Sequence, residues 1–367
     1  MRDKYFFMHH ALELARLTIG QTRPNPSVGA VVVKDGKVVG TGTHMKSGEP
    51  HAEVFALKQA GELAKDAEIY VTLEPCAHYG KTPPCAKAII DAGIKKVYVA
   101  TLDPNPKVAG GGVEWIRSED IDVEAGILEQ EAQDINKMFF HFMKTKRPYI
   151  TLKTAVSLDG KMTANSGDSK WITSDQSRLD VHHNRHRHDA ILVGSETVLR
   201  DDPLLTTRLP RGGMNPTRIV LDTHLSIPLE AKLLTNDDSN TIVVCGKEAN
   251  TNKEKALNEI SHVQVWRQNS DQIDLELLLG QMAEEKLMSL YVEGGSTIHS
   301  AFIQNQLFNE IHVYMAPKLI GGAMSKSFYN QLGFDEVKDS IQIEFDSVET
   351  IGQDLKIIAK PHEEEDS

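Results

Sequence analysis

The hydrophobic pattern of the first 147 residues predicts strands that alternate with helices. Apolar residues recur at helical spacing over residues 5–18, which predicts an amphipathic helix. Apolar runs at 28–33 and 37–43 flank the turn Lys34-Asp35-Gly36, a pattern typical of a β-hairpin. Further helices are expected over 52–64, 85–92 and 128–143, with strands over 68–73 and 95–100. This order implies a sheet with helices packed on it.

A second α/β unit is predicted after the basic, proline-ended connector 144–148 (KTKRP), where we place the domain boundary. Its expected strands are 149–156, 190–193, 218–221, 241–245, 290–292, 311–316, 341–347 and 355–359. Residues 236–240 and 248–253 are expected to be polar loops. The expected division is therefore 1–147, 148–360 and an acidic tail, 361–367. A length of 367 residues agrees with two domains.

Composition and charge favour a small-molecule partner. The net charge is −12, yet residues 1–147 are balanced, so the whole acidic excess lies in the remainder. A protein that binds a nucleic-acid duplex normally shows the opposite sign. No window has the roughly 18 apolar residues of a membrane span, and the amino terminus is a poor secretory signal. Three cysteines are too few for a disulfide framework, so a cytoplasmic location is expected.

The strongest chemical signal is His51-Ala52-Glu53 followed by the segment 75–85, PCAHYGKTPPC. One imidazole and two thiolates suit Zn²⁺ and leave a fourth position for water. His51, Cys76 and Cys85 are therefore the predicted ligands. Cys85 begins a predicted helix, and a helix start lowers a thiol pKa, so we expect this thiol to ionise readily. Glu53 is the expected proton carrier for hydrolytic deamination of a ring amidine, provided that His51 caps the first turn.

Other assignments near this motif are more open. A structural zinc site with His78 as fourth ligand is an alternative. Asn25 lies in the rigid turn Pro24-Asn25-Pro26 and could contact substrate or merely form the turn. His44 and Lys81 are further candidate substrate contacts, Lys81 through a phosphate, although surface exposure is an equal alternative.

The second half carries a different set of signals. Lys153 interrupts an otherwise apolar strand, so its burial requires a partner or a ligand, unless it lies at a strand end. Residues 292–298, VEGGSTI, are typical of a strand, a glycine turn and a helix start that can hold a diphosphate. Ser174 is a candidate helix cap, and Arg185 and Arg208 could grip a phosphate. The histidines at 182, 183, 186 and 188 are interpreted as a polar helix face rather than a metal site.

The two motif sets together resemble the bacterial bifunctional riboflavin-pathway enzyme. They are HAE with PCAHYGKTPPC in the first half, and TLKTAVSLDGK, DDPLLTTR and VEGGST in the second. That family joins diaminohydroxyphosphoribosylaminopyrimidine deaminase to 5-amino-6-(5-phosphoribosylamino)uracil reductase. The zinc deaminase signature is H-x-E with P-C-x-x-C. The eight residues that separate Cys76 from Cys85 here match the riboflavin family rather than generic cytidine deaminases.

The resemblance implies an α/β chain with an N-terminal cytidine deaminase-like α/β/α domain and a C-terminal dihydrofolate reductase-like domain. It implies Zn²⁺ and NADPH as cofactors, deamination of a phosphoribosyl pyrimidine, and then reduction of the ribosyl group to ribityl. Lys153 matches a lysine near the reacting carbon. The implied NADP contacts are Ala155, Trp171, Thr197, Asp201 and the turn 295–301, including Gly295, Ser296 and Thr297. The implied substrate contacts are Ser169, Arg185, Leu205, Arg208 and Glu293.

Two other functions remain open at this point. A nucleic-acid deaminase would bind RNA or DNA with a steep salt dependence, which the acidic charge disfavours. A non-enzymatic zinc-stabilised module would unfold on chelation. Whether Lys153 or Glu293 assists hydride transfer is also open. The resemblance suggests a homo-oligomer, whereas the apolar pattern and the charge predict no membrane and no nucleic-acid partner.

Overall fold

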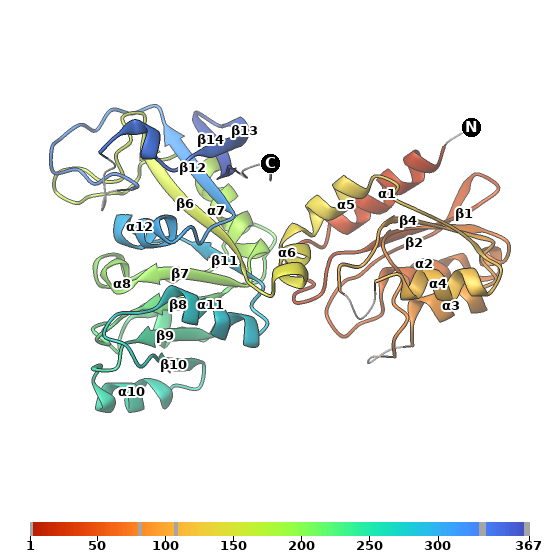
Figure 1. Cartoon of the computed structure of the whole chain (residues 1–367), viewed down its shortest axis with the longest axis horizontal. Helices are drawn as coiled ribbons and strands as arrows, with labels where there is room; N and C mark the ends of the chain where they lie inside the picture. Colours follow the sequence, from red (N-terminus) through yellow and green to blue (C-terminus); the bar gives the residue numbers. More distant parts are fainter. Residues whose placement is uncertain (1–2, 80–82, 106–108, 330–334, 363–367) are drawn as a thin grey trace. The chain divides into compact units, whose positions relative to one another are not determined.

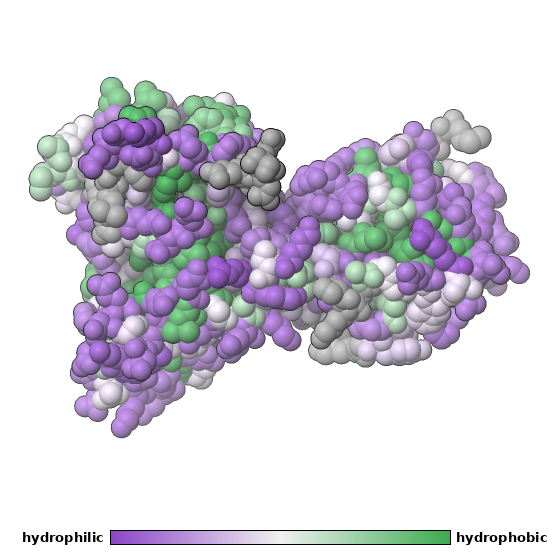
Figure 2. Space-filling view, viewed as in Figure 1, coloured by the Kyte–Doolittle hydropathy of each residue, from purple (hydrophilic) through white to green (hydrophobic). Residues whose placement is uncertain are grey.

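The computed structural model describes residues 3–79, 83–105, 109–329 and 335–362. The chain forms two compact units, Met1–Lys146 and Arg147–Ser367. In each unit hydrophilic residues dominate the visible surface, and apolar residues form smaller areas within it (Figure 2). In the described part of the chain no helix has both the length and the apolar composition needed to span a bilayer.

The first unit is built on a five-stranded sheet with the order β2-β1-β3-β4-β5. The hairpin β1–β2 and the pairing of β1 with β3 are antiparallel, whereas β3, β4 and β5 are parallel. The bounds are β1 Gly29–Lys34, β2 Lys37–Thr43, β3 Glu68–Leu73, β4 Lys96–Thr101 and β5 Asp122–Ala125. Strands β3 and β4 are buried at nearly every consecutive position and pair in parallel, which is typical of a sheet with helices on both faces.

The helices of the first unit form two groups on opposite faces of the sheet (Figure 1). Helices α1 (Lys4–Arg16) and α5 (Glu129–Ile135) contact each other, and α2 (Ala52–Ala60), α3 (Cys85–Asp91) and α4 (Gly111–Ser118) contact one another in succession. Phe7, Met8, Leu12 and Val31 are among the buried residues between α1 and the sheet. The unit is therefore an α/β/α sandwich, as the resemblance implied.

Two close approaches fix the helices against the strands. A Cβ at Gly29 would lie 2.0 Å from the Ala11 carbonyl oxygen in α1. A Cβ at Gly42 would lie 2.1 Å from the Ala52 carbonyl oxygen in α2. Only glycine permits these distances, so the hairpin strands specify where α1 and α2 lie.

Four expectations for the first unit differ from the structure. The expected helix 128–143 is two helices, α5 and α6 (Lys137–Thr145), which are separated at Asn136. The Asn136 side chain accepts from the Ser27 N–H at 2.8 Å and donates to the Ser27 carbonyl oxygen at 2.9 Å. The expected helix 52–64 ends at Ala60 and continues as the 3-10 turn η1, Gly61–Ala64. Helix α4 and strand β5 were not expected, because α4 begins with glycines and β5 has only four residues.

The second unit contains a nine-stranded sheet with the order β10-β9-β8-β7-β11-β6-β12-β14-β13. The strands from β10 to β12 are parallel, and β14 and β13 add an antiparallel edge. The bounds are β6 Tyr149–Ser157, β7 Ala190–Gly194, β8 Thr217–Leu221, β9 Thr241–Cys245, β10 Val263–Arg267, β11 Ser289–Val292, β12 Glu310–Ala316, β13 Ile343–Ile351 and β14 Asp354–Pro361.

Helices cover both faces of this sheet, because alternate residues of one strand enter different cores. Leu192 of β7 packs with α11 (Leu275–Glu284) and α12 (Ser296–Gln304). Ile191 and Val193 pack instead with residues of α8, α9 and α10. The remaining helices are α7 Asp175–Arg187, α8 Ser195–Asp201, α9 Lys232–Thr235, α10 Thr251–Asn258 and the 3-10 turn η2 Val337–Asp339. This arrangement agrees with the α/β class expected for the reductase half.

Sequence expectations for the second unit were wrong in three places. Strand β10 was missed, since its exposed and half-buried positions do not form an apolar run. The expected loop 248–253 includes the first turn of α10, which Asn250 caps by accepting from the Asn252 and Lys253 N–H groups. The expected turn 295–301 is mostly helix, because Gly295 is the N-cap of α12. Ser174 does cap α7, as expected, by accepting from the Ser177 N–H.

Candidate active sites

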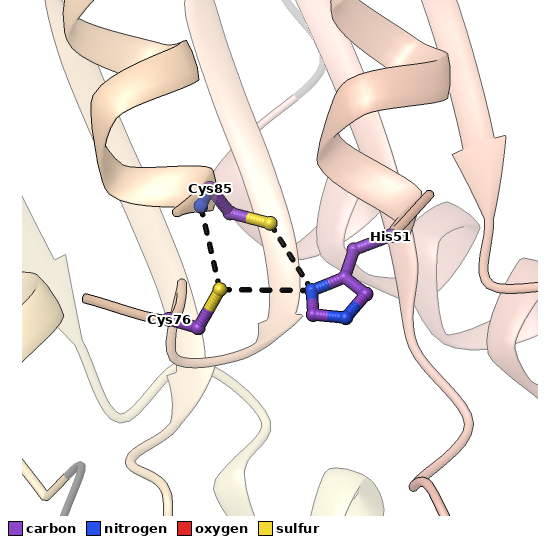
Figure 3. Close-up of side chains that lie close together, drawn as sticks. All are labelled: His51, Cys76 and Cys85. Atoms are coloured by element: carbon purple, nitrogen blue, oxygen red, sulfur yellow. Dashed lines mark hydrogen bonds between the residues drawn. The ribbon is translucent and has the colours of Figure 1, made fainter. Parts of the chain in front are cut away.

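His51, Cys76 and Cys85 meet at the ends of three different elements of the first unit (Figure 3). His51 is the N-cap of α2, Cys76 follows β3, and Cys85 is the first residue of α3. Their ligand atoms all lie within 4.8 Å of one another. His51 Nδ1 lies 3.2 Å from Cys85 Sγ and 3.7 Å from Cys76 Sγ. This set of one imidazole nitrogen and two sulfurs suits a tetrahedral Zn²⁺ that keeps one position open.

The start of α3 acts on Cys76 rather than on Cys85 itself. The Cys85 backbone N–H donates a hydrogen bond of 3.3 Å to Cys76 Sγ. Hydrogen bonding from the Cys85 side chain and from His51 lowers the pKa of Cys76 to about 4, whereas the same bond to Cys76 raises the pKa of Cys85. The helix start that was expected to lower the pKa of Cys85 therefore lowers that of its neighbour Cys76 instead.

Glu53 lies in the first turn of α2 and is 2% exposed. Burial raises the pKa of its carboxyl group to about 7, against the opposing effect of His51. Its Oε2 atom makes no hydrogen bond within the described residues. A buried carboxyl group with a pKa near neutrality is suited to accept and return a proton.

Asn25 and His44 form a polar wall beside His51. Asn25 Nδ2 lies 3.1 Å from His44 Nε2, and the His44 ring meets the His51 ring edge-on at a centroid distance of 5.2 Å. The other His44 nitrogen, Nδ1, lies 3.2 Å from the Pro50 carbonyl oxygen. The structure thus brings these two candidates to the metal-ligand group. His78 is exposed and is not part of that group, and Lys81 lies outside the described residues.

One residue of this region was missed by the sequence reasoning. Glu74, which is buried, accepts hydrogen bonds from the backbone N–H groups of Asp103, Gly110, Gly112 and Val113, at 2.9 to 3.2 Å. It fixes the start of α4 against the end of β3, two residues before Cys76. A glutamate that follows an apolar strand gave no signal of such a role.

A cavity of about 1120 Å³ opens in the second unit at the carboxyl ends of its parallel strands. Ligands bind at this edge of open α/β sheets. All thirteen residues proposed for the reductase line it: Lys153, Ala155, Ser169, Trp171, Arg185, Thr197, Asp201, Leu205, Arg208, Glu293, Gly295, Ser296 and Thr297. Ala301, at the end of the expected turn, lies in α12 and does not line the cavity.

The cavity provides a cradle for a diphosphate at the start of α12. No side chain caps this nine-residue helix, so its first N–H groups are available. A Cβ at Gly295 would meet nothing within 4 Å, whereas one at Gly294 would lie 2.5 Å from the Ile298 Cβ. Free N–H groups, the positive helix end and open space above Gly295 fit the diphosphate of a dinucleotide cofactor.

Charged residues meet in the cavity around Glu293, which comes two residues before Gly295. Lys153 Nζ lies 3.4 Å from Glu293 Oε2, so the lysine in the apolar strand has the partner that its burial required. Arg185 Nε and Nη2 donate to Glu293 Oε1 and Oε2 at 2.6 and 3.1 Å, and Nη1 donates to the Thr206 carbonyl at 3.0 Å. Burial alone would raise the pKa of Glu293, yet the charges of Arg185 and Lys153 hold it at about 2.

Trp171 lies at the rim of the cavity rather than in a core. It is 62% exposed, and the Arg178 guanidinium lies 4.6 Å from the ring centroid. Nearby, Lys170 pairs with Asp201 at 2.9 Å. The Thr206 carbonyl accepts a hydrogen bond from Arg185, and His182 Nε2 lies 3.4 Å from Arg208 Nε; neither Thr206 nor His182 was proposed as a site residue. The spacing of His182 and Arg185, three residues apart on one helix, was the available signal.

Comparisons with known proteins give matches to both units. The sequence matches the cytidine and deoxycytidylate deaminase zinc-binding region over residues 1–101 and the RibD C-terminal domain over residues 148–357. It is 46% identical to the riboflavin biosynthesis protein RibD of Bacillus amyloliquefaciens, over 98% of this chain and 97% of the relative. It is also 46% identical to RibD of Aquifex aeolicus, over 96% of this chain and 97% of the relative.

Solved structures give the same result for the whole chain. RibD of Acinetobacter baumannii superposes with a TM-score of 0.90 at 39% identity, covering 98% of this chain and 99% of the other. A diaminohydroxyphosphoribosylaminopyrimidine deaminase/5-amino-6-(5-phosphoribosylamino)uracil reductase from Thermotoga maritima has a TM-score of 0.87 at 37% identity and covers 98% of each chain. The chain therefore belongs to the RibD family of riboflavin biosynthesis proteins, and it is a bifunctional zinc-dependent deaminase and NADPH-dependent reductase.

Proposed function

We propose that the first unit, as residues 1–147, deaminates 2,5-diamino-6-(5-phosphoribosylamino)pyrimidin-4-one. The observation that carries this proposal is the group His51, Cys76 and Cys85 with the buried carboxyl group of Glu53 beside it. Zinc, when bound by these three residues, supplies an activated water near neutral pH. The pathway placement follows from the family, and the ligand roles of these residues are part of the proposal.

Glu53 is the proposed proton carrier of the deaminase. A carboxylate accepts a proton from water as it attacks the ring carbon, and the resulting acid returns a proton to the departing amino group. A carboxyl pKa of about 7 allows both steps near neutrality. Asn25 and His44 are proposed to orient the pyrimidine, and Lys81 is proposed to contact its phosphate.

We propose that residues 148–360 reduce the ribosyl group of the deaminated product to ribityl. NADPH supplies the hydride when bound. Lys153 and Glu293 are proposed to stand at the reacting carbon, where the ammonium group stabilises negative charge and can give a proton to the substrate nitrogen. Glu293, which is itself paired with Arg185, holds the Lys153 side chain in place. The proposed cofactor contacts are Ala155, Trp171, Thr197, Asp201, Gly295, Ser296 and Thr297, and the proposed substrate contacts are Ser169, Arg185, Leu205, Arg208 and Glu293.

Further parts of the proposal concern the setting of the enzyme. The absence of a disulfide framework supports a cytoplasmic location. The acidic charge supports small-molecule substrates rather than nucleic acid. A homo-oligomer is proposed from the family alone, and residues 361–367 are proposed to be a solvated tail.

The decisive experiment uses the Glu53→Gln variant of the full chain. Ammonia release from the phosphoribosyl pyrimidine should fall at least about 100-fold, as expected for loss of a general acid–base group. NADPH oxidation with the deaminated pyrimidine should be unchanged, since Lys153 and Glu293 lie in the other unit. Loss of both activities in a folded variant would refute two separate sites.

A further inference from the structure

Two loops of the second unit are joined to each other beside the cavity. The β6 loop, residues 158–171, follows β6, and the β12 loop, residues 317–327, follows the neighbouring parallel strand β12. They lie side by side beyond the ends of these strands (Figure 1). The Met162 N–H donates to the Lys326 carbonyl oxygen at 2.8 Å. Both of these residues line the cavity, so the joined loops form part of its wall.

The β6 loop supplies most of this wall. Eight of its residues between Met162 and Trp171 line the cavity. They include Ser169, a proposed substrate contact, and Trp171, a proposed cofactor contact. Every residue of the β6 loop is exposed or half-buried, so no hydrophobic core fixes its position. The position of this wall must therefore come from polar contacts.

Asp159 joins the two loops through its carboxylate. Oδ1 accepts from the Ile320 N–H at 3.1 Å, and Oδ2 accepts from the Gly321 N–H at 2.7 Å. The buried Ser157 hydroxyl, at the end of β6, also donates to Oδ1, at 2.6 Å. The Ser157 hydroxyl and the two N–H groups lower the pKa of Asp159 to about 2, so the group is ionised at neutral pH. Hydrogen bonds to an ionised acceptor are stronger than those to a neutral one.

Other contacts hold the β6 loop further along its course. Ser325 Oγ donates to Asn165 Oδ1 at 3.2 Å, and Lys318 Nζ donates to the Trp171 carbonyl oxygen at 2.8 Å. The β12 loop thus holds the β6 loop from its start to its end. Ordering a long lysine side chain costs conformational entropy. Asp159, with three hydrogen bonds on a short side chain, is therefore the firmer attachment.

We propose that Asp159 is a positioning residue of the reductase: it fixes the β6 loop on the β12 loop and thereby holds in place the cavity wall that contacts NADPH. This inference rests on the proposed cofactor contacts of the second unit. Asp159 itself does not line the cavity. A site whose wall is in place for only a fraction of the time binds its ligand more weakly in the same proportion. Loss of Asp159 should therefore weaken binding without altering the chemical step.

The test uses Asp159→Asn in the full-length enzyme. The amide has nearly the shape of the carboxylate, but it lacks the charge, and its NH₂ group would face a donor. The dissociation constant for NADPH, from titration of the cofactor fluorescence without substrate, should rise about tenfold, as expected for loss of a hydrogen bond to a charged group. The KM for NADPH should rise with it, while kcat should change less than about twofold. A lower kcat with unaltered NADPH binding would place Asp159 in the chemical step and overturn the proposal.

Hydrogen–deuterium exchange provides a measurement that does not depend on activity. In Asp159→Asn, exchange should become faster in the β6 and β12 loops and should stay the same in β7 and β8. Faster exchange throughout the second unit would mean a general loss of stability and would overturn the positioning role. Faster exchange of the two loops with an unchanged NADPH dissociation constant would overturn it as well.

The matched control is Asp237→Asn, at an exposed aspartate outside the helices and strands of the same unit. This variant should bind NADPH and exchange its amides as the unaltered enzyme does. Lys318→Met removes the attachment at the end of the β6 loop and should raise the NADPH dissociation constant less than Asp159→Asn does; the reverse order would make Lys318 the main attachment and contradict the proposal. Failure of the unaltered enzyme to bind NADPH would refute the cofactor site itself, and this inference with it.

Discussion

The Arg185 guanidinium holds the Glu293 carboxylate at two points, with Nε–Oε1 and Nη2–Oε2 distances of 2.6 and 3.1 Å. Arg185 comes from α7, and Glu293 follows β11 at the carboxyl edge of the sheet. Lys153 of β6 reaches the same carboxylate. The geometry is a buried row of three charges, in which Arg185 fixes Glu293 and Glu293 fixes Lys153.

The first prediction concerns this row. Arg185→Gln should lower the reductase kcat by about tenfold or more, because Glu293 loses its two-point anchor and Lys153 loses its position. The free energy of unfolding should fall by about 3–5 kcal/mol, the usual cost of removing one member of a buried ion pair. Steady-state kinetics and urea unfolding measure the two effects.

Arg187, which is exposed on the same helix, provides the control: Arg187→Gln should change neither quantity appreciably. One other outcome would support the role of substrate contact that the family resemblance implied for Arg185. If Arg185→Gln raised only the KM for the phosphorylated substrate and left kcat intact, Arg185 would be a phosphate contact rather than a positioning residue.

The second prediction is a pH dependence of stability. The folded-state pKa of Glu293 is about 2, below its ordinary value of 4.5. At a pH above about 4.5, ionised Glu293 therefore stabilises the folded chain. This stabilisation declines as the pH falls from about 4.5 towards about 2. The stability difference between the unaltered chain and Glu293→Gln should be largest near neutrality and should shrink in that window. Urea unfolding of both proteins across the window measures it. A constant difference would show that Glu293 is not held ionised by its partners.

Motifs with local chemical meaning were predictable from the sequence. The set His51, Cys76 and Cys85 was recognised because ligand types and spacing carry the information, and their elements bring the three residues together. The hairpin and most strands were also predicted, since apolar runs between turn residues define them. Thirteen of the reductase residues that the family resemblance named line one cavity, whereas Ala301, at the end of the named turn, does not.

Relationships that depend on tertiary contacts were not predictable. The sequence around Asn136 does not indicate that this side chain forms hydrogen bonds with the Ser27 backbone and separates two helices. The pKa of Cys76 is lowered by the Cys85 side chain, by His51 and by the Cys85 backbone N–H, all of which only packing brings to it. Arg185 and Arg208 look equivalent in the sequence, and only the position of Glu293 shows that Arg185 is the one that binds this carboxylate.

The third prediction separates the two units by metal removal. Dialysis of the full chain against a strong chelator should abolish ammonia release and leave NADPH oxidation intact, because the ligand set lies wholly in the first unit. The bound ion also stabilises the folded state by mass action, so the first unit should unfold at lower temperature. Metal analysis, the two assays and calorimetry follow these changes, and added Zn²⁺ should restore them. Persistent ammonia release after complete zinc loss would exclude the proposed chemistry.

The fourth prediction tests how the hairpin positions the deaminase site. Gly42 of β2 approaches the carbonyl of Ala52, the residue between His51 and Glu53, and a Cβ there would lie 2.1 Å from that oxygen. Gly42→Ala must therefore push the start of α2 outwards. The free energy of unfolding should fall by about 1–3 kcal/mol, as for other overpacked sites, and zinc should dissociate faster because His51 moves with the helix.

Gly280→Ala is the control, since a Cβ at Gly280 meets nothing within 4 Å, and it should leave zinc retention unchanged. Equal zinc retention in Gly42→Ala would mean that His51 is positioned by Cys76 and Cys85 through the metal rather than by the packing of α2 on the hairpin.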